Sequence, residues 1–182
     1  MADEAIPRST KPRNDLTAEF VRSILDYDTE TGDLRWKTRT DVGAWWNGRY
    51  AGKRAGRPDK HGHLRLVVNN AAVTAHRLIW FMVTGEWPPD DIDHVNGLRA
   101  DNRWVNLRQA TRAQNLWNMR LKDSNMSGFK GVSKHTQCDR WVAQIRIPGG
   151  NRYLGLFHTP EEAHSAYVEA AIKLRGEFAR TK

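Results

Sequence analysis

The sequence predicts an α+β protein on three observations. Residues 14–75 contain a predicted short helix, a strand at 33–37 and a hairpin at 63–75. A strand, a long loop and a returning strand over residues 92–110 lead directly into a helix start at residue 112. Residues 127–182 contain alternating strands followed by a helix with strong capping signals. A chain of 182 residues has room for two small domains of this kind.

The composition favours a nucleic-acid partner. The chain has 29 Lys and Arg against 21 Asp and Glu, for a formal net charge of +8. Half of that excess lies in residues 127–182, which we therefore expect to bind a phosphate backbone most strongly. No apolar run is long enough to span a bilayer, so no membrane partner is expected. The single cysteine, Cys138, excludes an intramolecular disulfide and favours a reducing, intracellular setting.

The first expected elements are short. Residues 1–13 are basic and contain two prolines, so we expect a flexible leader, with folding to begin near Asn14. Thr17 is expected to cap a helix. Its apolar face comprises Phe20, Val21, Ile24 and Leu25. A turn at residues 28–32 and a strand at residues 33–37 follow.

Residues 44–58, rich in Gly, Arg and Trp, leave two interpretations open. They form either a DNA-contacting loop or a solvated turn region in which Trp45 or Trp46 covers the core. Residues 63–68 and 71–75 then predict a β-hairpin around an Asn-Asn turn.

A buried helix is predicted over residues 76–84, with Gly85 as its end. His76 has two interpretations: it faces a cleft, or it is a hydrogen-bonded core residue that holds this helix to the next hairpin. Arg77, at the helix start, either contacts phosphate or lies over the surface.

Asp93 and His94 are the main candidates for chemistry. They lie in a short strand whose partner is expected at residues 106–110. Neighbouring side chains of a regular strand point to opposite faces, so the chain must twist for both residues to line one site. The following pair, Asn96 and Gly97, tolerates such a turn.

A helix is expected to start at Arg112, because Thr111 and Gln114 have the spacing of a capping box. Asn115 then lies in the first turn. Asn118 follows at i+3 on the same face, either as a further metal or phosphate contact or as a solvated helix residue.

These residue types suit metal-assisted hydrolysis of a phosphodiester. Asp93 offers an anionic oxygen and Asn115 a neutral one, a pair that suits Mg²⁺ or Mn²⁺ better than a thiolate-binding metal. His94 is the expected general base, because an imidazole with a pKa near 6.5 is mostly neutral at physiological pH.

The run from Asp93 through Gly97, Asn106 to Arg108, and Asn115 resembles the HNH endonucleases, specifically the homing-type branch in which Asn replaces the last His. The resemblance covers roughly residues 76–120 and implies a ββα-metal unit. It also implies structural support from Asn106, whose side chain pins the loop by hydrogen bonds to the backbone, and a phage or bacterial intracellular context.

The C-terminal third has its own pattern. Thr159 is a predicted N-cap and Pro160 the first helical residue, and an apolar stripe follows it, comprising Ala163, Ala166, Tyr167, Ala170 and Leu174. In strand 140–147, Trp141, Ala143, Ile145 and Ile147 share one face, and Arg140, Val142, Gln144 and Arg146 share the other. Tyr153 is expected on the face away from Leu154 and Leu156.

Residues 127–180 resemble the DNA-binding domain of plant ethylene-response factors, the APETALA-like fold. The resemblance rests on Ser127 to Val132, Arg140 to Ile147, Tyr153 to Phe157 and the helix from Thr159. It implies a three-stranded antiparallel sheet packed on one helix. The candidate DNA contacts, each of which has a plain solvated role as its alternative, are Lys130, Lys134, Arg140, Gln144, Arg146, Arg152 and Tyr153.

Together these features predict a site-directed, metal-dependent DNA endonuclease that nicks one strand at a time. The expected organisation is a leader at 1–13, a nuclease region at 14–120 with its core at about 90–120, a linker at 121–126 and a DNA-binding domain at 127–182. The expected partner is double-stranded DNA, bound by a monomer, and the cofactor is one divalent cation. The alternative is a sequence-specific DNA-binding regulator with an inactive nuclease fold.

Overall fold

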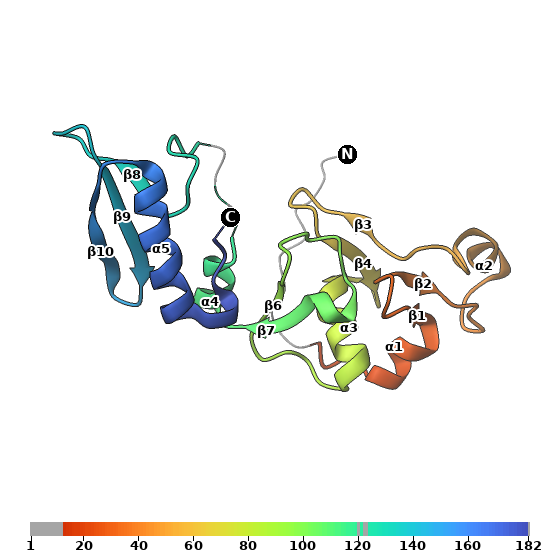
Figure 1. The fold of residues 1–182 in the computed structure, drawn as a ribbon. Coiled ribbons are helices and arrows are strands. Elements are labelled where there is room, and N and C mark those ends of the chain that lie inside the picture. The colour runs from red at the N-terminus through yellow and green to blue at the C-terminus, as the bar shows by residue number, and fades with distance from the viewer. Residues whose placement is uncertain (1–12, 120, 122–123, 182) are drawn as a thin grey trace. The chain divides into compact units, whose positions relative to one another are not determined.

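The computed structural model describes residues 13–119, 121 and 124–181, and it forms two compact units, 1–111 and 112–182 (Figure 1). Both units combine small antiparallel sheets with helices, so the α+β class is confirmed. The predicted leader lies outside the described residues except for Arg13, and so does part of the predicted linker.

The described residues of unit 1 form three α-helices and three small sheets. In chain order its elements are α1 (Ala18–Ile24), β1 (Leu25–Tyr27), β2 (Leu34–Trp36), α2 (Ala44–Tyr50), β3 (Arg57–Pro58), β4 (Leu64–Val68), β5 (Ala71–Thr74), α3 (Ala75–Thr84), β6 (Asp91–His94), the 3₁₀ turn η1 (Trp104–Asn106) and β7 (Leu107–Ala110). Strands pair as β1–β2, β3–β4–β5 and β6–β7, and every pairing is antiparallel.

The local signals of the N-terminal half are confirmed. The Thr17 hydroxyl accepts from the Phe20 amide at 3.1 Å and starts α1. The β4–β5 hairpin turns through Asn69 and Asn70, both at positive φ, as a tight hairpin turn requires. Helix α3 ends at Gly85, which adopts the left-handed conformation at φ 84°.

Helix α3 forms the centre of the core of unit 1. Leu78 and Ile79 are fully buried, and α1 packs against this helix. Arg77 is buried as well, and its guanidinium donates to the carbonyl of Asp90 at 2.9 Å and to that of Pro88 at 3.3 Å. Both sequence-based interpretations of Arg77 are therefore wrong: it braces the segment that leads into β6.

Residues 44–58 contain the short helix α2, which neither interpretation included, and their contact with DNA stays a prediction. Trp46 packs on Trp36 with ring centroids 5.4 Å apart, and Arg39 lies over its ring. Trp45 is 71% exposed and covers no core. Sequence reasoning missed this helix because it has a glycine in its interior, which weakens the helix signal.

Unit 2 is a three-stranded sheet with a long helix on one face (Figure 1). Its elements are α4 (Arg112–Trp117), β8 (Val132–Lys134), β9 (Trp141–Ile147), β10 (Gly150–Phe157), α5 (Pro160–Arg175) and the 3₁₀ turn η2 (Gly176–Phe178). The strand order is β10–β9–β8, all antiparallel. The predicted N-cap of α5, Thr159, is confirmed, and Glu162 completes a capping box with it.

The apolar stripe of α5 is shifted from its predicted position. Ala163 and Tyr167 are buried as expected, but the stripe continues through Ala171 to Arg175, and Leu174 is 41% exposed. A spacing of four residues keeps these side chains on one helical face, whereas Leu174 lies off that line.

Helix α4 starts at Arg112, as predicted, and it groups with the C-terminal elements. The reason is specific contacts within unit 2. The Lys130 ammonium donates to the carbonyls of Trp117 and Met119, each at 2.7 Å, and the Arg175 guanidinium lies 5.2 Å from the Trp117 ring centroid.

Gly131 provides a test of how closely β8 and α5 pack. It has φ +75°, and a Cβ atom there would collide with the Tyr167 ring. We expect Gly131→Ala to lower the free energy of unfolding by about 2–4 kcal/mol, from left-handed strain and overpacking together. Gly128→Ala is the matched control, because Gly128 has φ +72° and open space around it, so only about 1–2 kcal/mol should be lost. Equal losses in a denaturant titration would contradict this packing.

Candidate functional site

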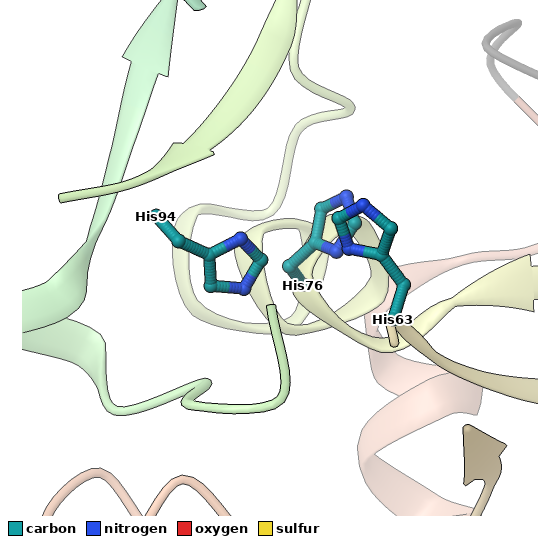
Figure 2. A group of neighbouring side chains, drawn as sticks. All are labelled: His63, His76 and His94. Carbon is teal, nitrogen blue, oxygen red and sulfur yellow. The ribbon is translucent and has the colours of Figure 1, made fainter. Parts of the chain in front are cut away.

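Three histidines from separate elements of unit 1 gather into one cluster (Figure 2). His94 ends β6, His76 is the second residue of α3, and His63 directly precedes β4. The ring centroids lie 4.9 Å (His63–His76), 5.1 Å (His76–His94) and 5.6 Å (His63–His94) apart. One nitrogen from each ring lies within 4.8 Å of the others. His76 is thus a buried residue of α3 and a neighbour of His94, and its Nε2 lies 3.4 Å from the Thr74 hydroxyl. A cleft facing His76 stays a prediction.

A hydrogen bond to Asn102 sets the tautomer of His94. Nε2 of His94 lies 3.1 Å from Oδ1 of Asn102, and Nδ2 of Asn102 faces the carbonyl of Ala100 at 3.4 Å. With the amide oriented in this way, Oδ1 accepts and His94 Nε2 donates. The lone pair of the neutral ring is therefore on Nδ1, the atom that can take a proton.

Burial keeps the cluster uncharged. It lowers the pKa of His63 to about 4 and the pKa of His76 well below 6.5. Repulsion from any neighbouring ring that gained a proton would lower both pKa values further. The pKa of His94 is also lowered by burial, although its bond to Asn102 opposes the shift. A neutral His94 at physiological pH is the form that a general base needs.

Asp93 does not join the histidine cluster within the described residues. It pairs across the hairpin with Arg108, whose Nη2 and Nε lie 2.9 Å and 3.1 Å from Oδ2 of the carboxylate. A carboxylate oxygen is the donor type that a hard cation such as Mg²⁺ prefers. A cation there must share the carboxylate with Arg108, a partner that sequence reasoning missed.

The loop between β6 and β7 is closed by side-chain hydrogen bonds. Oδ1 of Asn106 accepts from the Asn96 amide at 2.9 Å, and Nδ2 of Asn106 donates to the carbonyl of Asp101 at 2.7 Å. The Asn96 side chain in turn donates to the Asp101 carboxylate at 2.7 Å. Hydrogen bonds from Arg103 lower the pKa of Asp101 to about 2, so this brace stays intact at neutral pH. The support role of Asn106 rests on these contacts.

The same loop docks on the β1–β2 turn. The Tyr27 hydroxyl donates to the carbonyl of Asn102 at 2.8 Å, and the Trp104 amide donates to that of Thr29 at 3.1 Å. A Cβ atom on Gly32 would collide with the backbone of Asn102 and Arg103. The N-terminal hairpin therefore fixes the residue that orients His94.

Asn115 and Asn118 belong to unit 2, whereas Asp93 and His94 belong to unit 1. Asn115 lies in α4 and is partly buried. Its role as a metal ligand stays a prediction. Asn118 follows the end of α4 and is 7% exposed, so its interpretation as a solvated residue is wrong.

The sheet face of unit 2 opposite α5 presents polar side chains. Gln144 pairs with Tyr153 and Arg146 with Asn151, and directly paired residues share a face. All four are exposed, Tyr153 to 62%, and Arg140 is exposed just before β9. The predicted alternation of strand 140–147 is thus confirmed.

A β-bulge between Tyr153 and Gly155 changes one assignment. Leu154 packs on the α5 side, as expected, but Leu156 pairs with Val142 and so lies on the same face as Tyr153. The predicted separation of Tyr153 from Leu156 is wrong because the bulge inserts one residue into the alternation.

Three predicted DNA contacts do not lie on this face. Lys134 shares a face with Val132 and Trp141, where its ammonium pairs with Asp139 and lies 4.8 Å from the Trp141 ring centroid. Arg152 pairs with Ile145, on the α5 side of the sheet. The Lys130 ammonium is engaged at the end of α4, and burial lowers its pKa to about 8.

Comparison with known proteins gives two findings. Residues 73–116, which include Asp93, His94 and Asn106, match the family model described as HNH endonuclease. Over most of its length the chain is also similar to plant AP2-like ethylene-responsive transcription factors. ANT from Arabidopsis thaliana is 30% identical over 173 residues, which cover 88% of this chain and 30% of ANT. PLT2 from the same plant is 28% identical over 179 residues, which cover 95% of this chain and 30% of PLT2. AIL6, also from that plant, is 41% identical over 76 residues, which cover 38% of this chain and 13% of AIL6.

The chain thus spans less than a third of the length of these relatives. None of its described helices combines the length and apolar character needed to cross a membrane.

Acidification should destabilise the full chain through the histidine cluster. The folded-state pKa values lie below the unfolded value of about 6.5, so below that pH the unfolded chain binds more protons. The stability contributed by the neutral rings is complete above about pH 6.5 and is lost as the pH falls towards 4. We expect the free energy of unfolding, measured in EDTA, to be lower at pH 5 than at pH 7.

The variant His63→Gln is the control, because its side chain does not titrate. It should lose less stability than the wild type between pH 7 and pH 5. Parallel pH dependences of the two proteins would show that His63 does not contribute.

Proposed function

We propose that this chain binds duplex DNA through the exposed face of the β8–β10 sheet. The observation that supports this is the shared face of Gln144, Arg146 and Tyr153, with Arg140 beside it, in the most basic third of the chain. A sheet with such side chains fits a major groove, where Arg can bond guanine edges and Gln can bond adenine. The similarity to AP2-like transcription factors extends over the same residues and supports the proposal further.

Arg146 and Lys134 form a matched pair for testing this face. Both are exposed cations of the same sheet, but they lie on opposite faces. In the full chain we expect Arg146→Ala to weaken DNA binding, by about 1–3 kcal/mol on the preferred sequence if it bonds a base edge. If Arg146 contacts only phosphate, the slope of log affinity against log salt should fall by about 0.9.

Lys134→Ala removes the same charge and should leave affinity and salt slope nearly unchanged. Gel shifts on selected and scrambled duplexes at two salt concentrations distinguish these outcomes. A larger loss for Lys134→Ala than for Arg146→Ala would refute the assigned face.

We further propose that unit 1 makes the chain a metal-dependent DNA endonuclease of the HNH type. The observation behind this is the buried, neutral His94, whose Nε2 is held by Asn102 and whose Nδ1 can accept a proton from water. The match of residues 73–116 to HNH endonucleases supports the same function. Nicking of one strand at a time, by a monomer of the homing type, belongs to this proposal.

Asp93 would hold the divalent cation, Mg²⁺ or Mn²⁺. When bound, that cation would supply positive charge to a non-bridging phosphate oxygen. Arg108, fixed beside Asp93, adds a second positive charge near the same position. Asn106 keeps the loop in place, and Asn102 keeps the His94 ring oriented.

A DNA-binding regulator without cleavage activity is the second candidate. It is favoured by the extent of the similarity, since the matches to ANT and PLT2 cover 88% and 95% of the chain whereas the HNH match covers residues 73–116. The two candidates share DNA binding and differ only in whether a phosphodiester is hydrolysed.

A plasmid-nicking assay with Mg²⁺, Mn²⁺ or EDTA separates them. We expect nicking with either cation and none in EDTA, and His94→Ala should reduce the rate by about 10²–10⁴-fold while DNA affinity stays nearly constant. Because the pKa of His94 is lowered, the acid limb of the wild-type pH profile should lie below pH 6.5. If the folded wild type binds DNA but nicks with neither cation, the chain is a regulator and not a nuclease.

A further inference from the structure

The histidine cluster holds polar atoms that the contacts of unit 1 leave unused. Nδ1 of His63 and Nδ1 of His76 are buried and have no hydrogen-bond partner among the described residues. His76 is only 7% exposed. Buried nitrogens normally have partners, so two orphan atoms on neighbouring rings of one cluster indicate a ligand that accepts lone pairs.

We propose that His63, His76 and His94 bind one Zn²⁺ ion, at a site separate from the oxygen ligands expected for Mg²⁺. Three imidazoles from three elements offer nitrogens within 4.8 Å of one another. Tetrahedral zinc has nitrogens at about 2.0–2.1 Å, which are about 3.4 Å apart, so closing the site needs side-chain shifts of about 1 Å. Imidazole suits Zn²⁺, whereas Mg²⁺ prefers oxygen.

The hydrogen bond behind His94 supports zinc binding. Asn102 accepts from Nε2 of His94 and directs Nδ1 of that ring as a metal-bound histidine requires. Three protein ligands leave a fourth position for water, a coordination typical of open zinc sites rather than of closed structural ones.

Zinc at this site has a consequence that rests on the proposed endonuclease function. The Nδ1 lone pair of His94 cannot bind zinc and accept a proton from water at the same time. Zn²⁺ should therefore inhibit Mg²⁺-dependent nicking by occupying the base, and a chelator selective for zinc should restore the activity.

Binding is tested on the untagged full chain by titration with Co²⁺, which absorbs visible light strongly when tetrahedral, and by competition for Zn²⁺ with a colorimetric chelator. We expect one tetrahedral site per chain. His63→Ala should weaken zinc binding by more than about 100-fold. Asn102→Ala should weaken it by about 10–100-fold, because Asn102 orients the His94 ring without being a ligand itself. Far-UV circular dichroism checks that each variant folds.

His135→Ala is the matched control. Nδ1 of His135 lies 3.3 Å from Sγ of Cys138 on the exposed surface of unit 2, so this pair could also attract zinc. The variant His135→Ala should leave the tetrahedral site unchanged. A wild type without tight zinc binding, a folded His63→Ala protein that binds like the wild type, or loss of the site in His135→Ala would each overturn the proposal.

Inhibition is tested by adding Zn²⁺ to nicking reactions in excess Mg²⁺. Nicking should fall in proportion to the occupancy measured in the binding experiment. Undiminished nicking at full occupancy would overturn the assignment of His94 to the zinc site. Tight zinc binding by a chain that never nicks would support the site and refute the endonuclease proposal instead.

Discussion

The docking of the β6–β7 loop on the β1–β2 turn is the contact on which the candidate site depends. It fixes Asn102, which is 1% exposed, and Asn102 in turn fixes the His94 ring. Gly32 permits the close approach, and the Tyr27 hydroxyl bonds the Asn102 carbonyl; burial raises the pKa of Tyr27 to about 12, so it stays a donor. The N-terminal hairpin, which carries no motif of its own, thus orients the proposed base.

Sequence reasoning succeeded where local chemistry determines the structure. Thr17, the Asn-Asn turn, Gly85 and the Thr159 N-cap are short-range signals, and each lies where it was predicted. It failed where distant packing decides, as for the buried Arg77 and for Lys130 at the end of α4. A basic side chain next to a predicted helix or strand looks like a surface group, and only the fold shows which carbonyls it reaches.

The candidate site was predictable in part for the same reason. Asp93 and His94 are adjacent in the sequence and were singled out, but in β6 they meet different neighbours, Arg108 for one and the histidines for the other. His63 lies 31 positions before His94, and no sequence pattern connects the two, because their proximity results from the packing of α3 on β4 and from the contact between its His76 and His94. Asn102 was missed since an Asn in a polar loop is usually a turn residue.

The energetics of the cluster argue that it is more than packing. An unpaired buried polar group costs about 1–3 kcal/mol, and the cluster contains two, in a domain whose total stability is on the order of 5–15 kcal/mol. Aromatic or aliphatic residues of similar volume would fill the same space without that cost. Keeping three imidazoles neutral and close is costly in acid as well, because each ring binds a proton more readily in the unfolded chain. Such local cost is characteristic of functional sites, and here it leaves three imidazoles with nitrogens within 4.8 Å of one another, an arrangement that suits both proton transfer and metal binding.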